Sequence, residues 1–72
     1  MELNSYELRF WLDCGDFVDC EIDATSPERA IRFAAQAEGI ALSEIESVSF
    51  GDGQEFCSVS GRLVSLNALM AH

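Results

Sequence analysis

Two adjacent segments of alternating polarity constrain the fold of this chain more than any other feature. One set of alternate positions is apolar in each segment: Tyr6, Leu8, Phe10 and Leu12 in residues 5–12, and Val18, Cys20, Ile22 and Ala24 in residues 17–24. Period-two alternation is typical of a strand with one buried face. Because Asp13-Cys14-Gly15-Asp16 between the segments has turn chemistry, the pattern predicts a β-hairpin with one apolar and one polar face.

A helix is predicted directly after this hairpin. Ser26 can cap it, Pro27 suits the first helical position, and Glu28 favours the positive end of the helix dipole. A start one residue earlier would instead make Thr25 and Glu28 a capping box. Gly39 predicts an end after about residue 38. On a helical wheel one broad face is apolar, and we expect these residues to pack on the hairpin: Ala30, Ile31, Phe33, Ala34 and Ala37.

The remaining chain predicts a second hairpin. Residues 45–50 read as a strand with Val48 and Phe50 inward, Gly51-Asp52-Gly53 as a turn, and residues 54–60 as a weaker strand. Helical spacing near the end predicts a short C-terminal helix, or else an extended tail, carrying Leu63, Leu66, Leu69 and Met70. The expected fold class is α+β with the order ββαββ, in which one helix packs on one face of a small four-stranded antiparallel sheet. Residues 1–72 form a single domain.

The charge of the chain limits the classes of partner that it can bind. Thirteen acidic residues face four arginines, there is no lysine, and the formal net charge is -9. This balance disfavours binding to nucleic acid, which needs cations to replace phosphate counterions, and disfavours an anionic membrane surface. The natural partner of such a surface is a basic protein, although acidity also serves solubility alone.

Residues that carry catalysis are scarce. The single histidine is His72 at the end of the sequence, and Gly51-Asp52-Gly53 lacks the lysine and further glycines of a phosphate loop. Cys14, Cys20 and Cys57 have no metal-ligand spacing. Cys20 is expected to be a small core residue and Cys14 an exposed thiol. We therefore expect no enzyme activity, no catalytic or metal-binding residues and no cofactor.

The odd, sparse cysteines favour reduced thiols. No apolar run approaches the roughly 20 residues needed to cross a bilayer, and the first residues have no signal-peptide character. Together these features predict a cytoplasmic protein.

The polar face of the first hairpin is the candidate binding surface. Five acidic residues of this hairpin lie within the eleven positions 13–23, with no cation among them. The last three of them lie on one face of one strand, and two aromatic residues share that outward face. Alternate residues along a strand are separated by roughly 6.6–6.8 Å, a spacing comparable to that of consecutive phosphates on an extended nucleic-acid strand. The row could therefore imitate a phosphate backbone and occupy a basic groove, with the aromatic residues as anchors. The candidate partner-binding residues are Trp11, Asp13, Asp16, Phe17, Asp19, Glu21 and Asp23.

The acidic hairpin over residues 13–23 and the capped helix start Ser26-Pro27-Glu28-Arg29, in so short and lysine-free a chain, resemble the small anti-CRISPR proteins of phages and mobile elements. The resemblance is one of type across most of the chain. It implies a stoichiometric inhibitor that binds a CRISPR surveillance complex or nuclease and blocks target-DNA binding or nuclease recruitment. The alternative is a small phage or plasmid accessory module for protein interaction, monomeric or homodimeric through an open sheet edge.

Overall fold

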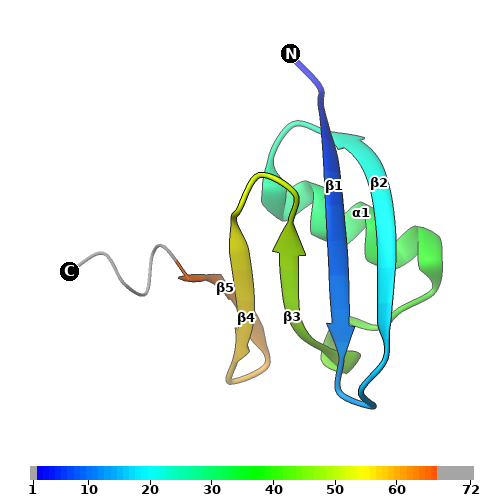
Figure 1. Ribbon diagram of the computed structural model, residues 1–72, viewed down its shortest axis with the longest axis vertical. Coiled ribbons are helices and arrows are strands. Elements are labelled where there is room, and N and C mark those ends of the chain that lie inside the picture. The colour runs from blue at the N-terminus through cyan, green and yellow to red at the C-terminus, as the bar shows by residue number, and fades with distance from the viewer. Residues whose placement is uncertain (1, 67–72) are drawn as a thin grey trace.

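The computed structural model describes residues 2–66, which form five strands and one α-helix (Figure 1). In chain order these are β1 (Asn4–Leu12), β2 (Phe17–Ala24), α1 (Pro27–Glu38), a 3-10 turn (Leu42–Glu44), β3 (Ile45–Phe50), β4 (Glu55–Val59) and β5 (Arg62–Ser65). The strands make one antiparallel sheet in the order β2-β1-β3-β4-β5. The α+β class is confirmed, and the described chain adds one strand to the expected ββαββ order.

The first hairpin has the predicted strands and faces. Phe10 lies opposite Val18, and Leu8 lies opposite Cys20, so the two apolar sets share one face of the sheet. The turn is tight: the Leu12 N–H donates to the Asp16 carbonyl at 2.9 Å, and Gly15 has a φ of 96°. A non-glycine residue rarely adopts such a backbone conformation, so Gly15 is the residue that lets the chain reverse here.

Helix α1 begins and ends where the sequence predicts. The Ser26 side chain accepts a hydrogen bond from the Arg29 N–H at 3.2 Å, so Ser26 is the N-cap and the earlier start at Thr25 is not adopted. Gly39 is left-handed with φ 71°, and the following N–H, of Ile40, donates to the Ala35 carbonyl at 2.9 Å. This arrangement satisfies carbonyl groups in the last turn.

The helix buries a narrower face than predicted. Its buried residues are Ala30, Ile31, Ala34 and Ala35. Ala37 is exposed, and Phe33 is 42% exposed, so the prediction that these two residues face the core is wrong. At 3.6 residues per turn, Phe33 lies about 130° from the middle of the buried stripe. One small sheet covers only one stripe of a helix, so the wider apolar face extends into solvent.

Strand β3 lies beside β1, which is thereby the second strand of the sheet. Val48 lies opposite Phe10, and Phe50 lies opposite Leu8, so both predicted inward residues of β3 are buried. The β1–β3 register shifts after Trp11, and Glu46 has no Cα partner there. This bulge turns Ile45 toward the core, although strict alternation from Val48 would not place it there. Phe10, Ile45 and Val48 are the largest fully buried side chains.

The chain after β4 departs from the prediction. Leu63 lies in strand β5, so a helix starting there is wrong. The reason is the turn between Val59 and Arg62, in which Ser60 (φ 53°) and Gly61 (φ 81°) are both left-handed. Two such residues form the tight turn that favours a hairpin, and β5 pairs with β4 at once. Leu69, Met70 and His72 lie outside the described residues.

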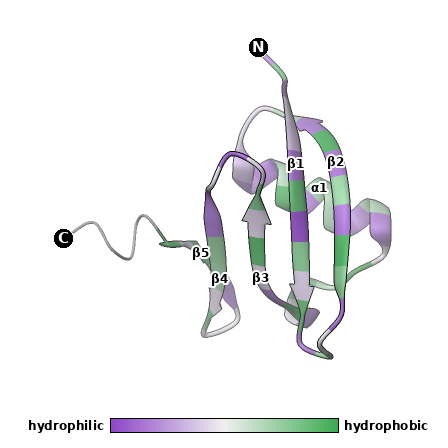
Figure 2. Cartoon of the chain, viewed as in Figure 1, coloured by the Kyte–Doolittle hydropathy of each residue, from purple (hydrophilic) through white to green (hydrophobic). Residues whose placement is uncertain are grey.

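The helix and the sheet form two layers, with α1 behind the sheet in Figure 1. Helix α1 packs mainly on β2 and also on β1. None of the described helices is long and apolar enough to cross a membrane. Along β1 and β2, hydrophobic and hydrophilic bands alternate (Figure 2). We call the side of the sheet opposite α1 the open face; at its β2–β1–β3 end it carries Ser5, Glu7, Arg9, Trp11, Phe17, Asp19, Glu21, Asp23, Ser47 and Ser49.

Candidate protein-binding face

The open face brings together five of the seven candidate binding residues. Trp11 comes from β1, and the other four come from β2: Phe17, Asp19, Glu21 and Asp23. The remaining two, Asp13 and Asp16, lie in the exposed turn at the end of the hairpin. Their backbone groups form hydrogen bonds at the turn: the Asp13 N–H donates to the Glu44 carbonyl at 3.0 Å, and the Asp16 carbonyl accepts from the Leu12 N–H. The turn acids therefore adjoin the face rather than belong to it.

The register of the hairpin decides which side chains meet on this face. The Leu12 N–H donates to the Asp16 carbonyl, so these two residues occupy a hydrogen-bonded position of the ladder, and hydrogen-bonded and non-hydrogen-bonded pairs alternate along an antiparallel ladder. The pairs on the open face are therefore the non-hydrogen-bonded ones, in which opposing side chains lie closest. Four such pairs line the face: Ser5 with Asp23, Glu7 with Glu21, Arg9 with Asp19, and Trp11 with Phe17.

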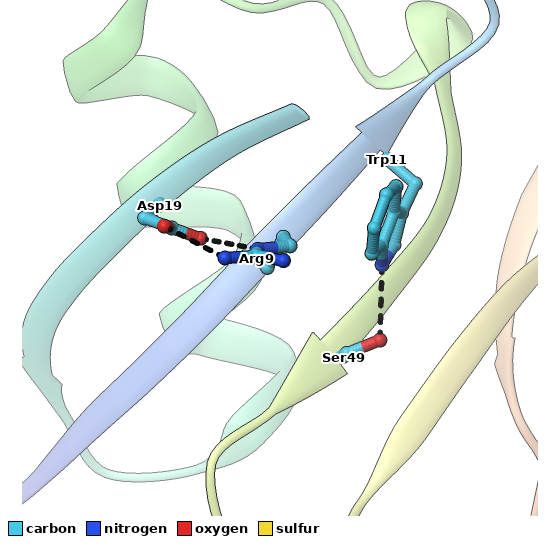
Figure 3. A network of polar contacts seen from close by, with 4 residues as sticks. All are labelled: Arg9, Trp11, Asp19 and Ser49. Atoms are coloured by element: carbon cyan, nitrogen blue, oxygen red, sulfur yellow. Dashed lines mark hydrogen bonds and ion pairs between the residues drawn. The ribbon is translucent and has the colours of Figure 1, made fainter. Parts of the chain in front are cut away.

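Arg9 neutralises one acid of the row. Its Nε lies 2.6 Å from Asp19 Oδ1 and its Nη2 lies 3.1 Å from Asp19 Oδ2, a two-point contact (Figure 3). The side-chain hydrogen bond from Arg9 lowers the pKa of Asp19 below its ordinary value. The guanidinium carbon also lies 4.1 Å from the centre of the Phe17 ring. The expectation of an acidic row without cations was incomplete, because a cation from β1 lies directly opposite Asp19.

Trp11 is held in place by three neighbours. Its indole N–H donates to Ser49 Oγ at 3.1 Å (Figure 3). Its ring centre lies 5.6 Å from that of Phe17, and the guanidinium carbon of Arg9 is 5.4 Å away. Trp11 remains 37% exposed and Phe17 50% exposed. An aromatic pair that is both exposed and already oriented loses little side-chain entropy on binding, which suits it to anchor a partner.

Glu7 and Glu21 form the acidic centre of the face. They lie directly opposite each other, and both are exposed. Among the described residues the structure gives neither carboxylate a hydrogen bond or an ion pair, whereas Asp23 accepts a hydrogen bond from Ser5 Oγ at 2.7 Å. Gly51 lies beside Glu7 and donates its N–H to the Glu7 carbonyl at 2.8 Å. These two glutamates line an open depression together with Trp11, Ser49 and Gly51.

Two of these residues, Arg9 and Glu7, were missed as site residues although the sequence contained a signal for them. A three-residue turn between Leu12 and Asp16 sets the whole register of the hairpin. Counting outward from that turn places Arg9 opposite Asp19 and Glu7 opposite Glu21. Alternation predicted their side of the strand correctly, but their partners across the hairpin follow only from this register.

The thiols contribute little chemistry to this face. Cys14 is exposed, whereas Cys20 and Cys57 are half-buried, and all three are free. Burial raises the pKa of the Cys20 thiol, so it stays protonated and weakly nucleophilic near neutral pH. Cys20 packs against the core from β2. Within residues 2–66, no three histidine, cysteine or acidic side chains are grouped as a metal site.

Comparison of the chain with protein-family models, with curated proteins and with solved structures gives no match.

Proposed function

We propose that this chain is a non-catalytic binding protein whose open face docks on a basic protein surface, and that it inhibits a CRISPR-Cas complex in the manner of the small anti-CRISPR proteins that it resembles. One observation carries the proposal: Glu7, Glu21 and Asp23 cluster on a sheet face that no described element covers, beside the oriented pair of Trp11 and Phe17. Aromatic anchors next to concentrated negative charge suit a cationic groove.

The charge of the whole chain supports the same partner. A net charge of -9 on 72 residues attracts a basic surface over a distance of about one Debye length and repels nucleic acid and anionic lipid. A groove that normally holds DNA is lined with lysine and arginine. A protein that fills such a groove competes with DNA directly, so it needs no catalytic group.

The test is a competition experiment with a panel of purified CRISPR effector complexes. Binding of labelled target DNA to each complex is measured while the protein is added in increasing amounts. We expect one complex to lose DNA binding near an equimolar ratio, with an inhibition that weakens as salt rises. A panel in which every complex keeps its full DNA affinity would refute the proposed occupation of a DNA-binding groove.

A matched variant tests the face itself. Replacing Glu21 and Asp23 by lysine moves the net charge from -9 to -5, since each reversal adds two charges. Like charges at an interface cost several kcal/mol, so inhibition should be lost. The control variant is Glu28→Lys with Glu38→Lys on α1, which changes the net charge equally on the other side of the sheet. Equal loss in both variants would show that total charge, rather than the open face, carries binding.

A further inference from the structure

Strand β2 is an edge of the sheet, and the direction of its free backbone groups follows from the hairpin register. Within the described chain β2 pairs with β1 alone. Because the Leu12 N–H donates to the Asp16 carbonyl, the alternation of the ladder assigns the N–H and C=O groups of Val18, Cys20 and Ile22 to β1. The same groups of the intervening residues, Phe17, Asp19, Glu21 and Asp23, point away from β1.

The β1–β3 pairing supports this assignment independently. The Glu7 carbonyl accepts a hydrogen bond from the Gly51 N–H at 2.8 Å, so the backbone of Glu7 is directed to the β3 side of β1. Glu7 and its partner Glu21 are therefore a non-hydrogen-bonded pair, as the count from the turn requires. On β2, the residues with free backbone groups are thus the same ones whose side chains lie on the open face.

We infer that the β2 edge accepts an extended segment of the basic partner as a sixth strand, with lysine or arginine at every second position. An added strand would satisfy the free N–H and C=O groups of Asp19, Glu21 and Asp23, which is the usual basis of strand addition. Its alternate cations would lie across from the same three carboxylates, where opposite charges stabilise cross-strand pairs. The inference rests on the proposed function, because it specifies how the basic partner is bound.

The neighbours of the three acids indicate which of them should contribute most to binding. Asp19 already has Arg9 as its counter-ion, and Asp23 accepts a hydrogen bond from Ser5. Across the hairpin, Glu21 lies opposite Glu7, another acid. A partner cation beside Glu21 would reduce this like-charge contact, so Glu21 should be the residue on which binding depends most.

A second copy of this chain does not suit the same edge. In an antiparallel pairing of two β2 strands, every register that joins more than one outward residue of each strand places an acid opposite an acid or opposite Phe17. Like charges directly opposite destabilise a strand pair, and charged edges are a known means of preventing self-association. The β2 edge therefore rejects its own copy while favouring a cationic strand.

The test uses two eight-residue peptides, as long as β2, with the same composition and charge. One alternates threonine and lysine; the other groups its four lysines at one end. We expect the alternating peptide to bind about tenfold more tightly at the same salt concentration, because only this peptide can form both the ladder and the charge pairs. A third peptide has the alternating sequence but is N-methylated at the residues whose backbone N–H groups would point to β2. It keeps the charge and loses those hydrogen-bond donors. It should bind no better than the grouped peptide.

Amide hydrogen exchange locates the contact. In the free protein, the amides of residues 18, 20 and 22 should exchange slowly and those of residues 19, 21 and 23 rapidly, since only the first set bonds to β1. Addition of the alternating peptide should slow the second set by about tenfold or more, in proportion to occupancy. The first set should change little.

Two variants separate the contribution of the Glu21 charge to peptide binding from that of its backbone N–H. Glu21→Gln and Glu21→Pro remove the same charge, but only proline removes the edge N–H, and edge strands tolerate proline at such positions. The proline variant should bind the alternating peptide about tenfold more weakly than the glutamine variant, provided that both fold. If the proline variant does not fold, the peptides decide the question.

Equal binding of the alternating and grouped peptides, or unchanged exchange at residues 19, 21 and 23, would overturn strand addition. So would a failure of both peptides to bind. The competition experiment with effector complexes would still test the proposed function, because it depends on the open face and not on the β2 backbone.

Discussion

Glu7 of β1 and Glu21 of β2 lie directly opposite each other in the middle of the open face, between two complementary pairs. Ser5 donates to Asp23 on one side, and Arg9 binds Asp19 on the other. The sheet thus holds one unfavourable cross-strand pair between two favourable ones. In our proposal a partner cation binds beside this pair. Glu21 therefore lowers the stability of the free protein but contributes to binding of the partner.

Replacing Glu21 by lysine should separate these two properties. The substitution converts a like-charge pair into an opposite-charge pair with Glu7, which should raise the free energy of unfolding by about 0.2–1 kcal/mol. The same change should abolish binding to the basic partner. Urea denaturation gives the first quantity and the competition experiment the second. Glu21→Gln is the control, and its effects should be smaller in both measurements. A destabilised lysine variant would contradict the cross-strand geometry.

The Arg9–Asp19 contact should make stability depend on pH in the acidic range. The folded-state pKa of Asp19 is lowered, chiefly by its hydrogen bond with Arg9. Its contribution is therefore present above the unfolded pKa of about 3.9 and is lost as pH falls through the lower folded value. Thermal denaturation should show Asp19→Asn less stable than the wild type at pH 7, with the difference shrinking toward pH 2. A difference that stays constant between pH 7 and pH 2 would contradict this role of the contact.

The two large apolar residues of α1 should respond very differently to truncation. Ile31 is 4% exposed, so Ile31→Ala should cost about 2–5 kcal/mol through lost burial and a cavity. Phe33 is 42% exposed, and Phe33→Ala should cost less than about 1 kcal/mol. Urea denaturation of the two variants makes the comparison. Similar losses of stability in the two variants would support the broad buried helix face that the sequence predicted.

The turn before β5 should be sensitive to backbone substitution alone. A Cβ on Gly61 would meet no atom within 4 Å, so Gly61→Ala tests only the strain of its φ of 81°. A left-handed residue with a Cβ costs about 1–2 kcal/mol. Ser60→Asn is the matched control, because asparagine followed by glycine favours this turn, and it should be neutral or stabilising. Thermal denaturation measures both. If Gly61→Ala did not lower the stability, Gly61 would not have the left-handed conformation described.

The elements of this protein could be predicted where their signals are local. Alternation in residues 5–12 and 17–24 specifies the hairpin strands and their faces, because the side-chain period of a strand is two. Ser26 and Gly39 specify the ends of α1, because capping involves backbone groups within one turn. The period of two is also sufficient to assign five candidate binding residues to one face of the hairpin.

The tertiary structure alone decided how these elements meet. Alternation does not say that β3 pairs with β1, that a bulge after Trp11 buries Ile45, or that α1 leaves Phe33 in solvent. Each outcome depends on contacts between distant segments, and the burial gained there outweighs local preference. The partners of the candidate site followed the same rule. Alternation placed the acids of β2 on one face, but their partners across the hairpin, Arg9 for Asp19 and Glu7 for Glu21, depend on the register in which β1 and β2 pair.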